Sequence, residues 1–472
     1  MQEQDNTTIG TKATTGTRDF LGSIMRGDKR IWSIYIALFC ISAVEIFSAT
    51  SQLTYKSAYV SDPAFGHIKL LFIGLIAVLL AQSLSMRAMR AWGIVVWVAA
   101  VASAILTPLI GIEQKGAARS LGFFQPVELV KLGVVMALCS AITARDATYR
   151  LFTIFRSKTQ VRRYWFYLVL IGLATGPIIF QNLSSGIIVC LASLGIMFLG
   201  RVNGKYLWIT IFVAIFVGVA FLGSLKAVHE SNKNVKGLAN ITVVDSGSAP
   251  KSGHTLDHWV DRASTWANRI FDESDKPLWE EDLNGKKSQE IYSCMALVNG
   301  YPFGKFIGNS KLRDFLPEAF SDYIFAIIFE EWGVLGALIV MLLYLGLLVR
   351  CVMLSRHSEN PYIRLMMVGL PLIMVIQALM HIGVCTGAMF VTGQPLPLLS
   401  RGGSSIMGTS ISFGLILALS RIIQQEQADR VAALATENVP ETAEMQPAEV
   451  VALQPSGNDT TETTTIDNNY NV

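Results

Sequence analysis

Three cationic side chains and one carboxylate lie close together in sequence near residue 120, and the three cations could bind an anion. Lys115 and Arg119 precede an apolar run that carries Glu128 and Lys131 in its first turns. Glu128 and Lys131 are three residues apart and share one face of a helix. One interpretation is a helix-capping and ion-pair arrangement. The other is a cationic rim of Lys115, Arg119 and Lys131 that binds an anion such as a pyrophosphate. The residues alone favour neither.

A carboxylate stands where a polar segment enters another apolar run. Asp322 follows Ser321 at the start of this run. Either residue could be the N-cap of a helix, and the frequency of such caps favours this interpretation. The alternative is a general base at the mouth of a cavity, because charged groups at membrane depth are functional candidates.

Three further polar breaks interrupt apolar sequence. Residues 393–405 combine prolines and glycines around Arg401, which indicates an irregular segment that lines a site and could contact an anion. Residues 181–186, beginning with Gln181, indicate a cavity wall. Glu330 and Glu331 are adjacent and point about 100° apart, so a buried structural carboxylate is the favoured interpretation there.

The elements that must position these groups are membrane-spanning helices. The chain has 472 residues, of which 52% are hydrophobic and only 15% charged, too few charges for a soluble surface. Runs long enough to cross a bilayer predict an all-α polytopic membrane protein with about ten transmembrane helices. These runs cover residues 31–50, 68–86, 91–111, 126–144, 164–181, 183–200, 205–223, 321–349, 365–390 and 404–421.

The distribution of basic residues predicts the orientation. Lys and Arg gather in the short loops that lie inside when the N-terminus is cytoplasmic. The prediction is a cytoplasmic segment 1–30, a membrane domain 31–421 and a disordered cytoplasmic tail 422–472. A large extracytoplasmic loop, 224–320, joins spans 7 and 8. The small net charge of +3 gives no reason to expect nucleic acid, and the scattered cysteines indicate no thiol-bound metal.

Several of these segments together resemble the SEDS family of bacterial cell-wall polymerases, which includes FtsW and RodA. The resemblance extends over roughly residues 31–425, and Gly-Asn-Ser followed by Leu-Pro-Glu-Ala is more similar to FtsW than to RodA. It rests on residues 124–132, 308–310, 316–325, 330–333 and 393–405, in the order and spacing of the family. The sequence departs from the family pattern at Ser120 and at Asn182-Leu183.

The resemblance implies a peptidoglycan glycosyltransferase that polymerises lipid II at the outer face of the inner membrane. It makes Asp322 the catalytic residue, which outweighs the cap interpretation. No cofactor is certain, and a divalent cation (Mg²⁺ or Mn²⁺) could assist. The expected substrate-binding residues are Lys115, Arg119, Lys131, Glu128, Gln181, Arg262, Glu318, Arg401 and Ser404.

The same resemblance implies partners and a place in the cell. Expected partners are lipid II, a transpeptidase of the class B penicillin-binding proteins, other division proteins and membrane lipids, but no nucleic acid. The expected location is the bacterial inner membrane at the division septum. The alternatives are a lipid II flippase or other transporter, an elongation polymerase similar to RodA, and a non-enzymatic scaffold of the division machinery.

Overall fold

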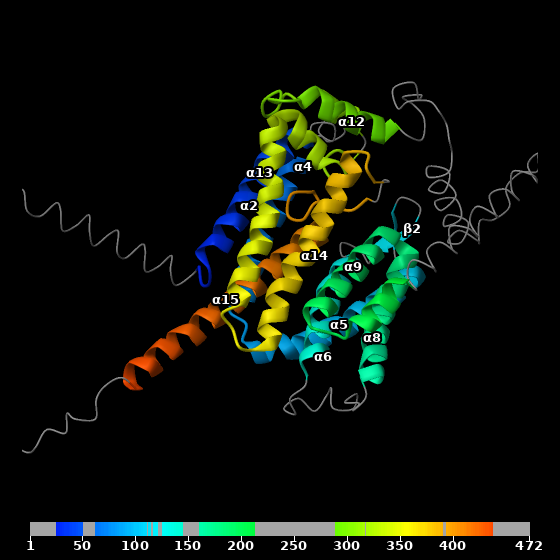
Figure 1. The fold of residues 1–472 in the computed structure, drawn as a ribbon. Helices are drawn as coiled ribbons and strands as arrows, with labels where there is room; N and C mark the ends of the chain where they lie inside the picture. The colour runs from blue at the N-terminus through cyan, green and yellow to red at the C-terminus, as the bar shows by residue number, and fades with distance from the viewer. Residues whose placement is uncertain are drawn as a thin grey trace, which may run out of the picture. The chain divides into compact units, whose positions relative to one another are not determined.

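The computed structural model describes nine stretches of the chain. They are residues 25–50, 62–110, 112–114, 117–120, 125–144, 160–212, 288–316, 318–389 and 393–437. The helices in these stretches include α2 (Lys29–Ala49), α4 (Asp62–Ala81), α5 (Met86–Ile110), α6 (Pro126–Thr143), α8 (Gln160–Gln181), α9 (Leu183–Leu199), α12 (Ser288–Gly300), α13 (Ile324–Ser355), α14 (Pro361–Cys385) and α15 (Gly403–Glu437). Most of them run along the length of one bundle, and α12 lies across one end of it (Figure 1).

The predicted helical membrane fold is confirmed. Seven of the described helices are long and apolar enough to cross a membrane, and 163–179 and 183–199 form shorter apolar helices. Residues 204–212 are helical, and the rest of the predicted span 205–223 lies outside the described residues. The elements that were not predicted include a short antiparallel hairpin of β1 (Ile112–Gln114) and β2 (Ala117–Ser120), and the helix α12 within the predicted outer loop 224–320.

Burial separates the inner helices from those that face outward. Most of α6 and α14 is buried, whereas α4 and α5 expose apolar side chains such as Phe72 and Trp92. Small residues allow an outer helix to approach an inner one closely: a Cβ on Gly133 of α6 would lie 3.0 Å from the Trp97 Cα of α5. The exposed apolar surface is the part that lipid covers, because a soluble protein rarely exposes such patches.

The last helix is longer than the sequence indicated. The prediction ended the final span at residue 421 and began a disordered tail at 422, but α15 continues to Glu437. Residues 438–472 lie outside the described residues. The polar composition after 421 indicated the end of an apolar run, which is not the end of a helix.

At one end of the bundle, an ion pair near the N-terminus joins the start of α2 to α13. Asp28 caps α2 by accepting from the Arg30 and Ile31 amides, and its Oδ2 lies 2.6 Å from Nη2 of Arg350 on α13. Its own amide donates to Ser420 on α15. Burial by itself raises the pKa of the Asp28 carboxyl, but the hydrogen bonds from Arg350, Ile31 and Arg30 outweigh it and lower the pKa. We call this the Asp28 end.

We expect Asp28→Asn to lower the free energy of unfolding by about 2 kcal/mol at pH 7, because a charge-assisted pair and part of a cap are lost. A carboxyl whose pKa is lowered in the folded state stabilises above its unfolded pKa and loses this contribution as pH falls through the folded pKa. The difference between variant and wild type should therefore shrink below about pH 4. Thermal unfolding of the wild type and of Asp28→Asn at pH 7 and below about pH 4 checks this. A stability difference between the two proteins that does not change with pH would contradict it.

Candidate functional site

Asp322 lies at the opposite end of the bundle, immediately before α13. The N-cap of α13 is Tyr323 and makes no side-chain cap hydrogen bond, so the cap interpretation of Asp322 and Ser321 is wrong. The Asp322 amide donates to the Glu318 carbonyl at 2.9 Å, and its Oδ1 accepts from Ser321 Oγ at 3.1 Å. Only 8% of Asp322 is exposed. The turn thus holds a nearly buried carboxylate outside the regular helix.

The segment between α14 and α15 packs against this turn. The Arg401 amide donates to the Phe320 carbonyl at 2.9 Å, and Ser400 Oγ donates to the Ser321 carbonyl at 2.7 Å. The Arg401 guanidinium lies over the Phe320 ring, 5.4 Å from its centre, and interacts electrostatically with Glu318. The structure therefore brings together three of the predicted site residues: Glu318, Asp322 and Arg401.

One face of α14 holds both of these segments. Gln377 Nε2 donates to the Pro395 carbonyl at 2.6 Å, and one turn later His381 Nδ1 donates to the Gln394 carbonyl at 2.8 Å. After another turn, Cys385 Sγ lies 4.0 Å from the Asp322 carbonyl oxygen. Residues four apart share a helix face, so α14 supports the irregular segment and the Asp322 turn along a single line.

The polar break between α8 and α9 meets the same irregular segment. Gln394 Nε2 donates to Ser185 Oγ at 2.6 Å. Gln181, at the end of α8, donates instead to the Ala104 carbonyl of α5 at 2.8 Å. Ser404 is buried in the first turn of α15. Gln394 thus connects the irregular segment to α9, and the cavity wall and the roles of Gln181 and Ser404 in substrate binding stay predictions.

Lys131 has partners inside the bundle. Its Nζ lies 2.7 Å from Oε1 of Glu128 and 2.7 Å from Oε1 of Gln377, and all three side chains are buried. This is the ion-pair arrangement, extended by a glutamine that also bonds the segment 393–401. These contacts give Lys131 and Glu128 a structural role, and the part of these two residues in substrate binding stays a prediction.

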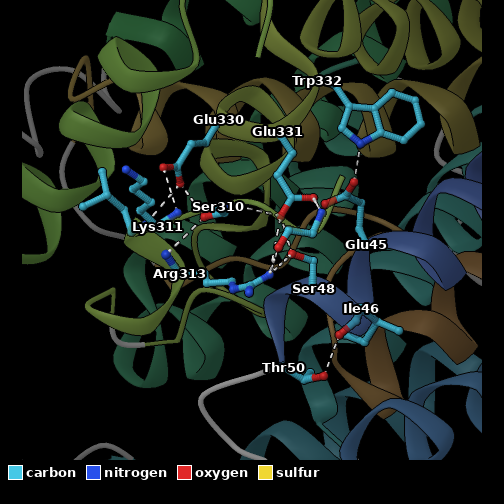
Figure 2. A network of polar contacts seen from close by, with 12 residues as sticks. Glu45, Ile46, Ser48, Thr50, Ser310, Lys311, Arg313, Glu330, Glu331 and Trp332 are labelled. Atoms are coloured by element: carbon cyan, nitrogen blue, oxygen red, sulfur yellow. Dashed lines mark hydrogen bonds and ion pairs between the residues drawn. The ribbon is translucent and has the colours of Figure 1, made fainter. Parts of the chain in front are cut away.

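Glu330 and Glu331 hold the polypeptide that leads to Asp322, and Figure 2 shows their contacts. Glu330 accepts from Asn299 Nδ2 at 2.5 Å, from the hydroxyl of Ser310 and from the Lys311 amide at 3.1 Å. Glu331 accepts from the Gly308 amide at 2.9 Å and from the hydroxyl of Ser48 on α2. The prediction of a buried structural carboxylate is confirmed, and it applies to both residues.

A cation and a third carboxylate complete this cluster. Arg313 Nη1 donates to Ser48 Oγ at 2.7 Å and lies 3.8 Å from Glu331 Oε1. Glu45 of α2 is fully buried and accepts from the indole N–H of Trp332. The pairs Glu45–Trp332 and Ser48–Glu331 join α2 to α13, and the loop before Asp322 is fastened to both (Figure 2).

Three predicted site residues cannot be placed relative to Asp322. Lys115 and Arg262 lie outside the described residues. Arg119 belongs to strand β2, and nothing is described of its side chain. Within the nine described stretches, no group of three or more His, Cys, Asp or Glu side chains could hold a metal ion. The divalent cation therefore stays a prediction.

Several residues that shape the site were not singled out in the sequence. Glu45 is a charged residue within the predicted span 31–50, and the rule that such charges are functional or paired could have identified it. Gln377 gave a weaker signal as a single uncharged amide within the predicted span 365–390, and Gln394 was part of the segment 393–405 without being named. Only their positions opposite Lys131 and Ser185 reveal what they do.

The arrangement combines groups for two chemical tasks. Asp322 is a carboxylate that can take a proton, and it is held without belonging to a helix cap. Arg401, half-buried nearby, supplies a fixed positive charge that can stabilise an anionic leaving group. Such a pair suits the transfer of a group from an anionic donor to a hydroxyl.

Two curated relatives are similar to the chain over most of its length. The chain is similar to the peptidoglycan glycosyltransferase MrdB of Escherichia coli K12, with 26% identity over 399 residues, covering 83% of this chain and 93% of MrdB. It is also similar to a probable peptidoglycan glycosyltransferase FtsW of Geobacter metallireducens, with 24% identity over 412 residues, covering 85% of this chain and 96% of that protein.

Solved structures show the same fold. A chain of a peptidoglycan synthase complex that coordinates polymerization and crosslinking matches with a TM-score of 0.58 and 22% identity, covering 84% of this chain and 99% of that one. The rod shape determining protein RodA of Thermus thermophilus matches with a TM-score of 0.53 and 21% identity, covering 84% and 97% of the two chains. The model of the cell cycle protein family that groups FtsW, RodA and SpoVE matches residues 28–425, and the chain belongs to this family.

Proposed function

We propose that this integral membrane protein is a peptidoglycan glycosyltransferase that polymerises lipid II, with Asp322 as its general base. The observation that carries the proposal is the Asp322 turn, held against Arg401 by two backbone-directed hydrogen bonds. The curated relatives MrdB and FtsW have the same enzyme class by name. Their similarity extends over most of this chain, and the family match over residues 28–425 includes both segments of the site.

The reaction can be written for these residues. Asp322 takes the proton of an acceptor sugar hydroxyl as that oxygen bonds to the anomeric carbon of the donor sugar. The bond between that carbon and the pyrophosphate oxygen breaks, and the lipid pyrophosphate leaves with the bonding electrons. Arg401 stabilises the negative charge on the leaving group. One carboxylate on the acceptor side fits a transfer that inverts the anomeric centre.

Lys115 and Arg119 would add to the positive charge that the leaving group meets. The proposal uses them as further pyrophosphate contacts, supported by their place in the sequence shortly before Glu128. Lys131 would act mainly by positioning other groups. It is paired with Glu128 and donates to Gln377, and Gln377 in turn donates to the segment that ends at Arg401.

The proposed orientation places the Asp322 end at the outer face of the inner membrane. The excess of basic residues in the loops at the other end supports it, with both termini cytoplasmic. A class B penicillin-binding protein is the proposed partner, because one matching chain belongs to a complex that couples polymerization to crosslinking. We propose a role in cell division at the septum. Elongation is the second candidate, because MrdB and RodA match about as much of this chain as FtsW does.

Purified protein and lipid II test the function. We expect glycan strands to form in detergent or liposomes, and gel separation of the products measures their length. Transfer of lipid II across a liposome membrane without polymer would show a transporter. No polymer and no transfer, even with the partner transpeptidase present, would favour a scaffold.

Arg401→Gln should slow polymerisation about 10-fold to 100-fold, because a positive charge facing the pyrophosphate is lost. Arg401→Lys keeps the charge and should retain more activity. The rate of lipid II consumption at saturating substrate checks both variants. Equal rates for the wild type and both variants would remove Arg401 from the proposed mechanism.

A further inference from the structure

A short segment at the Asp322 end exposes bulky apolar side chains. It connects α12 to the loop of Figure 2 and consists of residues 301–307. Tyr301 is 72% exposed, Phe303 90% and Phe306 80%, and Ile307 is also exposed. Exposed aromatic residues this close together mark a surface that contacts something.

The backbone of this segment is hydrogen-bonded even though its side chains are exposed. The amides of Lys305 and Phe306 donate to the Glu330 and Glu331 carbonyls, both at 2.9 Å, and the Val334 amide donates to the Pro302 carbonyl at 3.0 Å. These α13 groups are available because the helix breaks at Gly333. A backbone with paired polar groups can enter an apolar boundary without a large cost.

The segment and α13 are held in fixed contact. Gly333 has a φ of +66°, and a Cβ there would lie 2.3 Å from the Pro302 oxygen. Gly304 has a φ of +80°, and its Cβ would lie 2.3 Å from the Glu331 oxygen. Neither position can hold a larger residue without moving backbone. The aromatic side chains are therefore displayed at a height set by the break in α13.

The lengths of α2 and α13 indicate the depth of this segment relative to the apolar layer of a bilayer. The part of α13 after the break, residues 334–355, is about 33 Å long at 1.5 Å per residue, close to the ~30 Å apolar thickness of a bilayer. The 21 residues of α2 span about 31 Å, and Ser48 near its end bonds Glu331 beside the break. Both helices thus leave the apolar layer at the level of the segment.

The exposed side chains just below are those of membrane-facing helices. Phe47 of α2 and Leu335 of α13 are largely exposed, and Val334 is exposed directly after the break. The aromatic segment continues this surface toward the polar side. Its composition, aromatic rings with one exposed lysine, is that of a membrane interface, where rings lie at the headgroups and lysine reaches the phosphates.

We propose that residues 301–307 form an anchor that lies in the lipid interface at the Asp322 end, in contact with headgroups and the upper acyl chains. The anchor sets the height of residues 308–313, which Glu330 and Glu331 fasten, and so of the polypeptide that leads to Asp322. This inference concerns lipid contact and does not depend on the proposed reaction.

Spin labels on single cysteines test the anchor. The variants Phe303→Cys and Phe306→Cys are made in a Cys40→Ser protein, because Cys40 is exposed. The Cys40→Ser protein without an added cysteine is treated with the same label, and its signal is subtracted as background. Lys311→Cys is the matched control, an exposed polar position in the same fastened region. The labelled proteins are placed in lipid nanodiscs, and power saturation compares collisions with oxygen and with a water-soluble nickel chelate.

We expect the labels at 303 and 306 to collide often with oxygen and rarely with nickel, and the label at 311 to show the reverse. Nickel access at 303 equal to that at 311 would overturn the proposal. Shielding from both reagents would also overturn it, because protein would then cover the segment. Oxygen access that is lost when a single-span partner protein is added would assign the surface to that partner instead of lipid.

Discussion

Asp322→Asn is expected to abolish polymerisation of lipid II, with a rate at least about 100-fold below that of the wild type. The amide has nearly the same shape and can still accept from Ser321 Oγ, but it cannot take the proton of the acceptor hydroxyl. Because the cap of α13 does not use this side chain, the substitution should leave the helix start intact. Product analysis with purified protein and lipid II measures the rate.

Two comparisons make the result specific. Glu359→Gln removes an exposed carboxylate beside α14 at the Asp28 end and should polymerise like the wild type. Thermal unfolding of Asp322→Asn should lie close to that of the wild type, so that lost activity is not lost folding. Strands formed at more than half the normal rate by a folded Asp322→Asn protein would rule out Asp322 as the general base.

Glu331→Ala should destabilise the fold by about 3–5 kcal/mol, the largest effect on stability that we expect. The change leaves the Gly308 and Ser310 amides, the Ser48 hydroxyl and Arg313 without their buried acceptor. Glu331→Gln should cost about 1–3 kcal/mol, since one oxygen remains but an NH2 group then faces a backbone donor. Chemical or thermal unfolding in detergent measures both.

The control and the coupling test separate this cluster from a general loss of charge. Asp429→Asn removes an exposed carboxylate on α15 and should change stability by less than about 0.5 kcal/mol. Ser48→Ala combined with Glu331→Ala should cost less than the two single changes added together, because both remove the same contact between α2 and α13. Full additivity would mean that the two side chains do not interact.

The helices could be predicted from the sequence because lipid imposes a simple rule. A run of about twenty apolar residues must hydrogen-bond its own backbone, and only a helix does so within one segment. The predicted spans 126–144 and 183–200 agree with α6 and α9 to within one residue at each end. The rule fails at α15, where the helix continues into polar sequence for which lipid gives no signal.

The local roles of the charged residues were partly predictable. The three-residue spacing of Glu128 and Lys131 indicated their ion pair, since neighbours on one helix turn meet whatever surrounds them. The choice for Asp322 between helix cap and general base could not be made locally. It depends on whether α13 starts at residue 323, which would make Asp322 its N-cap, or at Ile324 as observed, and the hydrogen bonds of Arg401 and Ser400 to the Asp322 turn help set that geometry.

By itself, the sequence determined that this protein lies in a membrane, roughly which runs cross it, and that charged groups such as Lys131, Glu330 and Glu331 must find partners there, because each of these follows from the cost of exposing polar groups to lipid. Only the tertiary structure decided which partners they find. Gln377 meets Lys131 across 246 positions of sequence, and Ser48 meets Glu331 across 283. Such pairs depend on how helices pack side by side, and no spacing along one helix encodes that.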